Sequence, residues 1–208
     1  MMRIGLVIWV IIAAIVSGTA PIEPELSELM MAYQAGRLEA FDALYAKLAP
    51  KLRGYLSSHT YNASLTEDLL QETFLQIHRS RHTYAPPRPV RPWVFAIARH
   101  VYLMHRRASA RRYSVETAAP GELPEVPVPP AMEQLGSHRD VWRALAELSD
   151  DRREAVLLHH VWGFTFGEIG AMLGIRAGTA KLRAHRAISA LRTLLASPDA
   201  RGGARDPR

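Results

Sequence analysis

Hydrophobic residues recur every three or four positions along most of the chain, which is the spacing of amphipathic α-helices. The first such segment covers residues 25–57, and Gly36 separates two runs within it. Pro50 suits the first turn of a helix, so we expect a further helix to begin there. The pattern predicts two or three helices of a bundle in this segment.

The next predicted helix, over residues 65–81, opens with the form of a capping box, because Glu67 follows Ser64 by three positions. Its expected buried stripe is Thr66, Leu70, Thr73, Phe74 and Ile77. Its expected outer face is Asp68, Gln71, Glu72, Leu75 and Arg79. Charges at helical spacing are ordinarily only solvated, but the leucine among them favours a protein-binding surface.

A proline-rich loop over residues 82–92 precedes a helix that we expect to begin at Trp93. The predicted core stripe of this helix is Trp93, Val94, Ile97, Val101 and Met104. The predicted opposite face is Phe95, Arg99, Tyr102 and Arg106. Aromatic rings interleaved with arginines suit single-stranded nucleic acid, because bases stack on rings while guanidinium groups hold phosphates. The alternative is that Phe95 and Tyr102 pack against a neighbouring helix.

Residues 114–131 hold five prolines, three glutamates and no basic residue, which is typical of a flexible linker. Helical periodicity resumes at Val141. Ser149 is a suitable N-cap for the helix that follows, with two aspartates in its first turn, and Gly163 is its expected C-cap.

Residues 165–195 have the pattern of a helix-turn-helix. We expect a short helix over residues 166–173, a left-handed turn at Gly174 and a second helix from about Ala177. The predicted core stripe of the second helix is Ala180, Ala184, Ala187, Leu191 and Leu194. Its opposite arc is Lys181, Leu182, His185, Arg186 and Ser189. The cationic arc suits the major groove of DNA, whereas a merely solvated basic face is the alternative.

Residues 1–20 differ from the rest, because thirteen uncharged residues over 4–16 follow a basic start. This run is short for a membrane span, which needs about 20 residues. Three explanations compete: a start codon assigned too early, a membrane tether and a cleaved signal peptide. We favour the first, because the chain after Pro21 has the pattern of a complete soluble protein.

The chain has 208 residues, a net charge of +6 and no cysteine. The positive charge favours an anionic partner, and the absence of cysteine excludes disulfides, cysteine-ligated zinc and thiol catalysis. Nine histidines are present without a metal-ligand spacing such as HExxH. We therefore expect no catalytic site, no cofactor, no metal and no small-molecule substrate.

Three segments occur in the order and spacing seen in bacterial sigma factors: DLLQETFLQIHR, RPWVFAIARHVYLMHRR and, after a linker, LSDDRREAVLLHHVWGFTFGEIGAMLGIRAGTAKLRAHRA. The chain resembles the compact extracytoplasmic-function (ECF) group of the sigma-70 family over residues 26–195. The sequence departs from the family motif where His100 replaces an asparagine and Met104 replaces an aspartate, which affects the expected preference at the −10 element.

The resemblance implies a role for each of three helices. The polymerase-binding residues would be Asp68, Leu69, Gln71, Glu72 and Leu75. The residues that open and bind the −10 element would be Trp93, Phe95, Arg99, His100, Tyr102, Arg106 and Arg107. The residues that bind the −35 element would be Arg176, Gly178, Thr179, Lys181, Leu182, Arg183, His185 and Arg186.

The expected protein is therefore all-α, with two small helical domains joined by a flexible proline-rich linker. The expected segments are a leader (1–21), region 2 (22–113), the linker (114–135), the region 4 helix-turn-helix (136–195) and a disordered tail (196–208). Its implied partners are core RNA polymerase, promoter DNA and an anti-sigma factor, in the cytoplasm. Membrane contact is expected only if residues 1–20 are translated and retained. A stand-alone helix-turn-helix regulator with an N-terminal sensor or dimerisation domain is the rival hypothesis.

Overall fold

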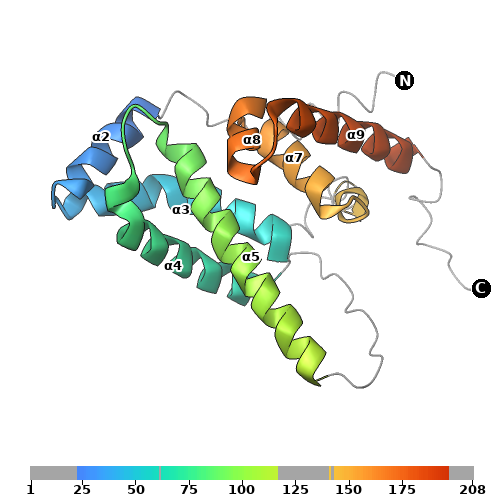
Figure 1. The fold of residues 1–208 in the computed structure, drawn as a ribbon, viewed down its shortest axis with the longest axis horizontal. Coiled ribbons are helices and arrows are strands. Elements are labelled where there is room, and N and C mark those ends of the chain that lie inside the picture. The colour runs from blue at the N-terminus through green and yellow to red at the C-terminus, as the bar shows by residue number, and fades with distance from the viewer. Residues whose placement is uncertain (1–22, 61, 117–140, 142, 197–208) are drawn as a thin grey trace, which may run out of the picture. The chain divides into compact units, whose positions relative to one another are not determined.

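A computed structural model describes residues 23–60, 62–116, 141 and 143–196, and its regular elements within these ranges are helices (Figure 1). The predicted all-α class is confirmed. The predicted leader, most of the predicted linker and all but the first residue of the predicted C-terminal tail lie outside the described residues. No helix of the described part is long and apolar enough to cross a membrane.

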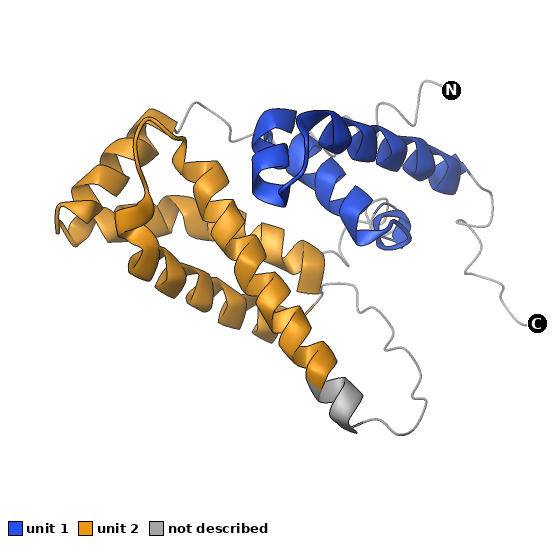
Figure 2. Cartoon of the chain, viewed as in Figure 1, with its two compact units in different colours: residues 1–20, 130–208 blue, residues 21–129 orange. Residues whose placement is uncertain are grey.

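The helices fall into two compact units, with the division near residue 130 (Figure 2). The first unit along the chain, drawn orange and labelled unit 2 in Figure 2, contains α2 (Glu23–Gln34), α3 (Glu39–Thr60), α4 (Ala63–Ser80), the short 3₁₀ helix η1 (Arg81–Thr83) and α5 (Val90–Glu116). The second contains α7 (Asp150–His160), α8 (Phe166–Leu173) and α9 (Ala177–Ala196).

Helix α3 is central to the first unit, because it packs against α2, α4 and α5. It continues through Pro50, so the prediction of a new helix at that residue is wrong. Proline in a helix interior removes one hydrogen bond and crowds the preceding turn. Here Leu48 and Leu52 are almost fully buried on either side of the exposed Pro50, and the burial of the continuous apolar stripe offsets that cost.

Helix α4 begins two residues before the predicted start, at Ala63 rather than Leu65. Its N-cap is Asn62, whose side chain accepts a hydrogen bond from the backbone N–H of Leu65 at 2.9 Å. Glu67 accepts two hydrogen bonds from the Arg53 guanidinium instead, at 2.5 and 3.0 Å, and these bonds hold the pKa of the Glu67 carboxyl below its usual range. The capping box at Ser64 is therefore wrong, because a tertiary ion pair engages its glutamate.

Helix α5 begins at Val90, three residues before Trp93, because a distant side chain caps it. The carboxylate of Glu23 in α2 accepts hydrogen bonds from the backbone N–H groups of Val90 and Arg91, at 2.9 and 3.2 Å. These groups have no partner within an isolated helix. The cap ties the first turn of α2 to the first turn of α5.

The core of the second unit is one cluster of aliphatic side chains. The cluster is formed by Ala144, Leu145, Leu148, Val156, Leu157, Ala187 and Leu191. Helix α7 ends at His160, and Gly163 adopts its left-handed conformation (φ 71°) in the turn beyond, so it is not the C-cap we expected. Ser149 is the N-cap of α7, although its side chain makes no capping hydrogen bond.

The helix-turn-helix has the predicted boundaries. Thr165 and Glu168 form a reciprocal capping box at the start of α8, and Gly174 ends this helix with φ 68°. The backbone of the turn passes close to Gly170, where a Cβ atom would be 2.7 Å from the carbonyl oxygen of Ile175. A glycine at this position lets the turn pass directly over α8.

Candidate nucleic-acid and protein interfaces

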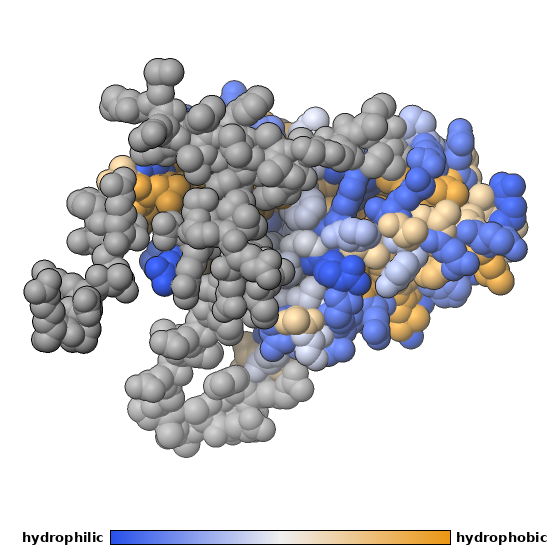
Figure 3. Space-filling view, turned by 180° about the vertical axis from the view of Figure 1, so that it is seen from behind, coloured by the Kyte–Doolittle hydropathy of each residue, from blue (hydrophilic) through white to orange (hydrophobic). Residues whose placement is uncertain are grey.

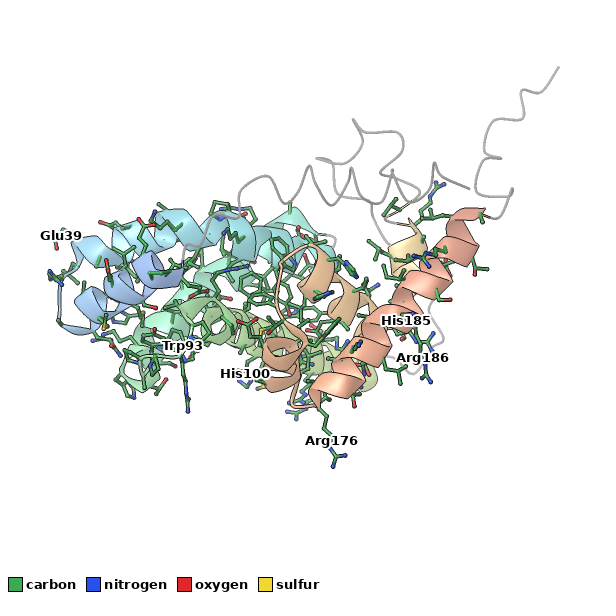
Figure 4. The ribbon with its side chains drawn as sticks, turned by 90° about the horizontal axis from the view of Figure 1, so that it is seen from above. Glu39, Trp93, His100, Arg176, His185 and Arg186 are labelled. Atoms are coloured by element: carbon green, nitrogen blue, oxygen red, sulfur yellow. The ribbon has the colours of Figure 1, made fainter. Side chains whose placement is uncertain are left out.

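One face of α9 is buried and the opposite face is exposed. Ala180, Ala184 and Ala187 are at most 2% exposed, so the helix lies close to its neighbours. The predicted core residue Leu194 is an exception, because it is 36% exposed near the end of the helix. The exposed predicted DNA contacts are Arg176, Gly178, Thr179, Lys181, Leu182, His185 and Arg186. Figure 4 shows Arg176 at the N-terminal end of α9, and His185 and Arg186 further along the same helix.

Arg183 differs from the other predicted contacts of α9. Its guanidinium pairs with the carboxylate of Asp151 in α7 at 2.8 Å, and its side chain is only 29% exposed. This ion pair links α9 to the first turn of α7. Arg183 is therefore engaged within its own unit, whereas its neighbours on the exposed arc are available to a partner.

The exposed face of α5 is not the one that the sequence predicted. Phe95 is 1% exposed and packs against Tyr55 with ring centroids 5.3 Å apart, so its assignment as a surface contact is wrong. Met104, assigned to the core, is 49% exposed. Phe95 is buried although Met104 is exposed, because α2, α3 and α4 all pack against α5 and together bury a wide arc of its surface.

Five residues of α5 with accessible side chains nevertheless share one stripe at helical spacing. The stripe consists of Trp93, Ile97, His100, Met104 and Arg107, of which the first two are partly buried. Trp93 packs against Tyr84 at 5.7 Å, which fixes the indole at the edge of the bundle. Figure 4 shows Trp93 and His100 on this helix. An apolar and basic stripe of this kind offers both stacking surface and cations.

The remaining predicted α5 contacts lie beside the stripe. Tyr102 is partly buried and its ring lies 5.0 Å from that of His59. The guanidinium of Arg106 lies 5.9 Å from the Tyr102 ring centroid, within cation–π range. Arg99 is partly buried. The role of these three residues in binding DNA stays a prediction.

Helix α4 presents the predicted acidic face. Asp68, Gln71 and Leu75 are exposed, and Leu75 remains 42% accessible despite its apolar side chain. Glu72 is partly buried and accepts a hydrogen bond from Gln76 at 2.6 Å. Leu69 is 5% exposed, so its assignment to the polymerase-binding face is wrong. The whole inner stripe from Thr66 to Ile77 is buried as predicted.

An exposed tyrosine beside this face was not among the predicted contacts. Tyr45 of α3 packs its ring 4.5 Å from the ring of Phe74, yet remains 41% exposed. Phe41 completes the aromatic group, at 6.1 Å from Phe74. Hydrophobic residues also lie scattered among hydrophilic ones on the surface of the first unit (Figure 3).

Within the described residues, no group of three or more histidine and acidic side chains could hold a metal ion. Three surfaces are candidate interfaces: an acidic face with an exposed leucine on α4, an apolar and basic stripe on α5, and a basic arc on α9.

Comparisons with known proteins match both units. The sigma-70 region 2 profile matches residues 44–112, and the sigma-70 region 4 profile matches residues 138–191. The chain is 39% identical over 170 residues to the RNA polymerase sigma factor CarQ of Myxococcus xanthus, covering 80% of this chain and 95% of that one. It is 32% identical over 154 residues to the ECF RNA polymerase sigma factor SigL of Mycobacterium tuberculosis, covering 74% and 87%.

Solved structures agree with the fold. The structure of CnrH in complex with the cytosolic domain of CnrY aligns with a TM-score of 0.60 and 25% identity, covering 80% of this chain and 94% of that one. The sigma factor RpoE in complex with the anti-sigma factor NepR, from Bartonella quintana, aligns with a TM-score of 0.62 and 24% identity, covering 76% and 98%. With matches to both conserved regions and to curated relatives over most of its length, the chain belongs to the ECF group of sigma factors in the sigma-70 family.

Proposed function

We propose that this protein is a transcription initiation factor that binds core RNA polymerase and directs it to promoters, with no catalytic site of its own. The first unit binds polymerase and the opened −10 element, and the second binds the −35 element as duplex. The observation that carries the proposal is the α9 arc, where cationic residues are exposed directly opposite a fully buried alanine stripe. This arrangement fits a recognition helix in a major groove.

The polymerase contact is assigned to the exposed part of the α4 face. Leu75 supplies apolar area for the centre of a protein interface, and Asp68 and Gln71 supply polar groups for its rim. We extend this surface to Tyr45, because an exposed tyrosine held by ring packing is a typical interface anchor. Leu69 supports the face from within the core.

The −10 contact is assigned to the α5 stripe and to the neighbouring Tyr102 and Arg106. Opening a duplex costs stacking free energy of about 1.4 kcal/mol per base-pair step. Stacking of an extruded base on an aromatic side chain returns about 1–3 kcal/mol. Among the α5 side chains whose burial the structure describes, Trp93 and Tyr102 are the aromatic residues that retain accessible surface for this purpose.

The cytoplasm is the proposed location, because core RNA polymerase and promoter DNA are the proposed partners. An anti-sigma factor is a further proposed partner. The CnrH relative was solved with the cytosolic domain of CnrY, which supports the idea that proteins of this fold are held by a second protein.

The test is polymerase binding and promoter-specific transcription by the full chain, with Asp68→Ala combined with Leu75→Ser. Loss of one charge-assisted contact at an interface costs about 1.5–3 kcal/mol, so we expect polymerase affinity to fall at least tenfold. Glu28→Ala, an exposed acidic residue on α2, is the matched control and should leave affinity unchanged. Tight duplex binding by a chain that never associates with polymerase would favour the stand-alone regulator instead.

A further inference from the structure

The second unit contains a groove of about 290 Å³ on one side of α9. Lys181, Ile188 and Arg192 line it from α9, while His159, His160 and Phe166 line it from the junction of α7 and α8. All of these residues belong to one compact unit. The volume is close to the lower end of small-ligand pockets, about 300 Å³.

Positive charge surrounds an apolar floor in this groove. Lys181 and Arg192 are eleven residues apart on one helix, so they lie about 16 Å apart along its axis. Ala184 and Ile188 form the floor between them, and no acidic side chain contributes to the lining. An anion that enters the groove therefore meets cations and no carboxylate.

The opposite wall is aromatic and fixed. The His159 ring stacks on the Phe166 ring with centroids 4.1 Å apart, and it meets His160 edge-on at 4.8 Å. The Nδ1 atom of His159 lies 2.9 Å from the carbonyl oxygen of Phe164. Because a carbonyl oxygen only accepts, Nδ1 carries the hydrogen, and this bond holds the ring in place.

We propose that this groove binds an organic phosphate, with the phosphate at the Arg192 guanidinium and the apolar body over Ala184, Ile188 and Phe166. Two sources supply this chemistry: a free phosphorylated small molecule and a backbone phosphate of duplex DNA. Lys181 and His185 belong both to the groove lining and to the exposed arc of α9. A free ligand is therefore expected to compete with duplex DNA for these residues. This competition rests on the proposed function, whereas binding of the organic phosphate to the groove does not.

The experiment titrates the full chain with phenyl phosphate, and separately with inorganic phosphate, by calorimetry and amide NMR shifts. We expect phenyl phosphate to bind at least tenfold more tightly, because only its ring uses the apolar floor. Ser189→Glu places a carboxylate on the exposed rim and Arg192→Gln removes a cation, so each should weaken binding at least tenfold. Arg152→Gln, an exposed arginine of α7 outside the groove, is the matched control. Circular dichroism verifies that each variant is folded.

A labelled duplex distinguishes the two sources. If phenyl phosphate displaces the duplex and Arg192→Gln leaves duplex affinity unchanged, the ligand of the groove is a free small molecule. Duplex affinity that falls in Arg192→Gln by the same factor as phenyl phosphate affinity identifies a backbone phosphate. Equal binding of phenyl and inorganic phosphate, or unchanged binding by Ser189→Glu, overturns the site. If polymerase and duplex binding stay intact in that case, only the groove proposal fails.

Discussion

His160 is half-buried at the C-terminal end of α7, with the His159 ring packed edge-on against it at 4.8 Å. Burial disfavours the charged imidazolium, and the neighbouring histidine opposes a second positive charge. Both effects lower the pKa of His160 below its ordinary value of 6.5. The folded state therefore binds this proton more weakly than the unfolded chain does.

The stability of the second unit should consequently decrease with acidification. Above pH 6.5 His160 is neutral in both states and does not affect the free energy of unfolding. As the pH falls from 6.5 to the lower pKa of the folded state, the unfolded chain binds the proton first and the free energy of unfolding decreases. We expect faster hydrogen exchange of α7 amides at pH 5.5 than at pH 7.5, after correction for intrinsic rates. His160→Gln should reduce this difference. His82→Gln, in the other unit, is the control, and an equal reduction there would refute the assignment.

At the scale of elements, the helix-turn-helix depends on one close backbone contact. The backbone N–H of Ile175 donates to the carbonyl oxygen of Gly170 at 2.9 Å, across the turn between α8 and α9. A Cβ atom on Gly170 would lie 2.7 Å from the Ile175 carbonyl oxygen and 3.1 Å from the Ala177 nitrogen. Both neighbours are backbone atoms, so they cannot move without shifting the start of α9.

Gly170→Ala should therefore destabilise the second unit and misplace the recognition helix. Overpacking in a closely packed site costs about 1–3 kcal/mol, and we expect a lower thermal midpoint by calorimetry together with weaker duplex binding. Gly167→Ala in the same helix is the matched control, because its Cβ would meet its nearest neighbour at an ordinary 3.9 Å. If the two variants melted alike, backbone crowding at Gly170 would not be the determining contact.

At the scale of the whole molecule, charge is distributed by role. The chain carries a net charge of +6, yet the outer face of α4 presents Asp68 and Glu72 while the arc of α9 presents arginine, lysine and histidine. Placement of opposite charges on separate helix faces allows a protein partner and DNA to be bound by different surfaces. Two units on one chain also gain affinity from effective concentration when both sites are engaged.

Promoter binding by this protein with polymerase should weaken steeply with salt, because each phosphate contact releases counterions. Each neutralised phosphate contributes about 0.9 to the slope of log K against log salt. Arg176→Gln, at the exposed start of α9, should reduce that slope by about one unit. Arg37→Gln, an exposed arginine of the first unit outside the assigned interfaces, should leave the slope unchanged. A slope unaffected by Arg176→Gln would exclude a phosphate contact at this residue.

Much of the fold of this protein could be predicted from local patterns in its sequence. The period of the hydrophobic residues predicted helices, and the Thr165, Gly174 and Ala177 positions defined the helix-turn-helix, because caps and turns depend on nearby residues. The buried stripe of α4 and the alanine stripe of α9 were predicted from the same hydrophobic period. Order and spacing of motifs were sufficient to indicate the family.

The tertiary structure decided what a helix with several neighbours buries. Phe95 is buried and Met104 exposed because α5 contacts three helices, an arc that the sequence of α5 alone does not define. Long-range partners also replaced local ones: Arg53 engages Glu67, and Glu23 caps α5 from a helix that begins 67 residues before Val90. The groove beside α9 exists only because α7, α8 and α9 converge, and no periodicity within one helix specifies such a meeting.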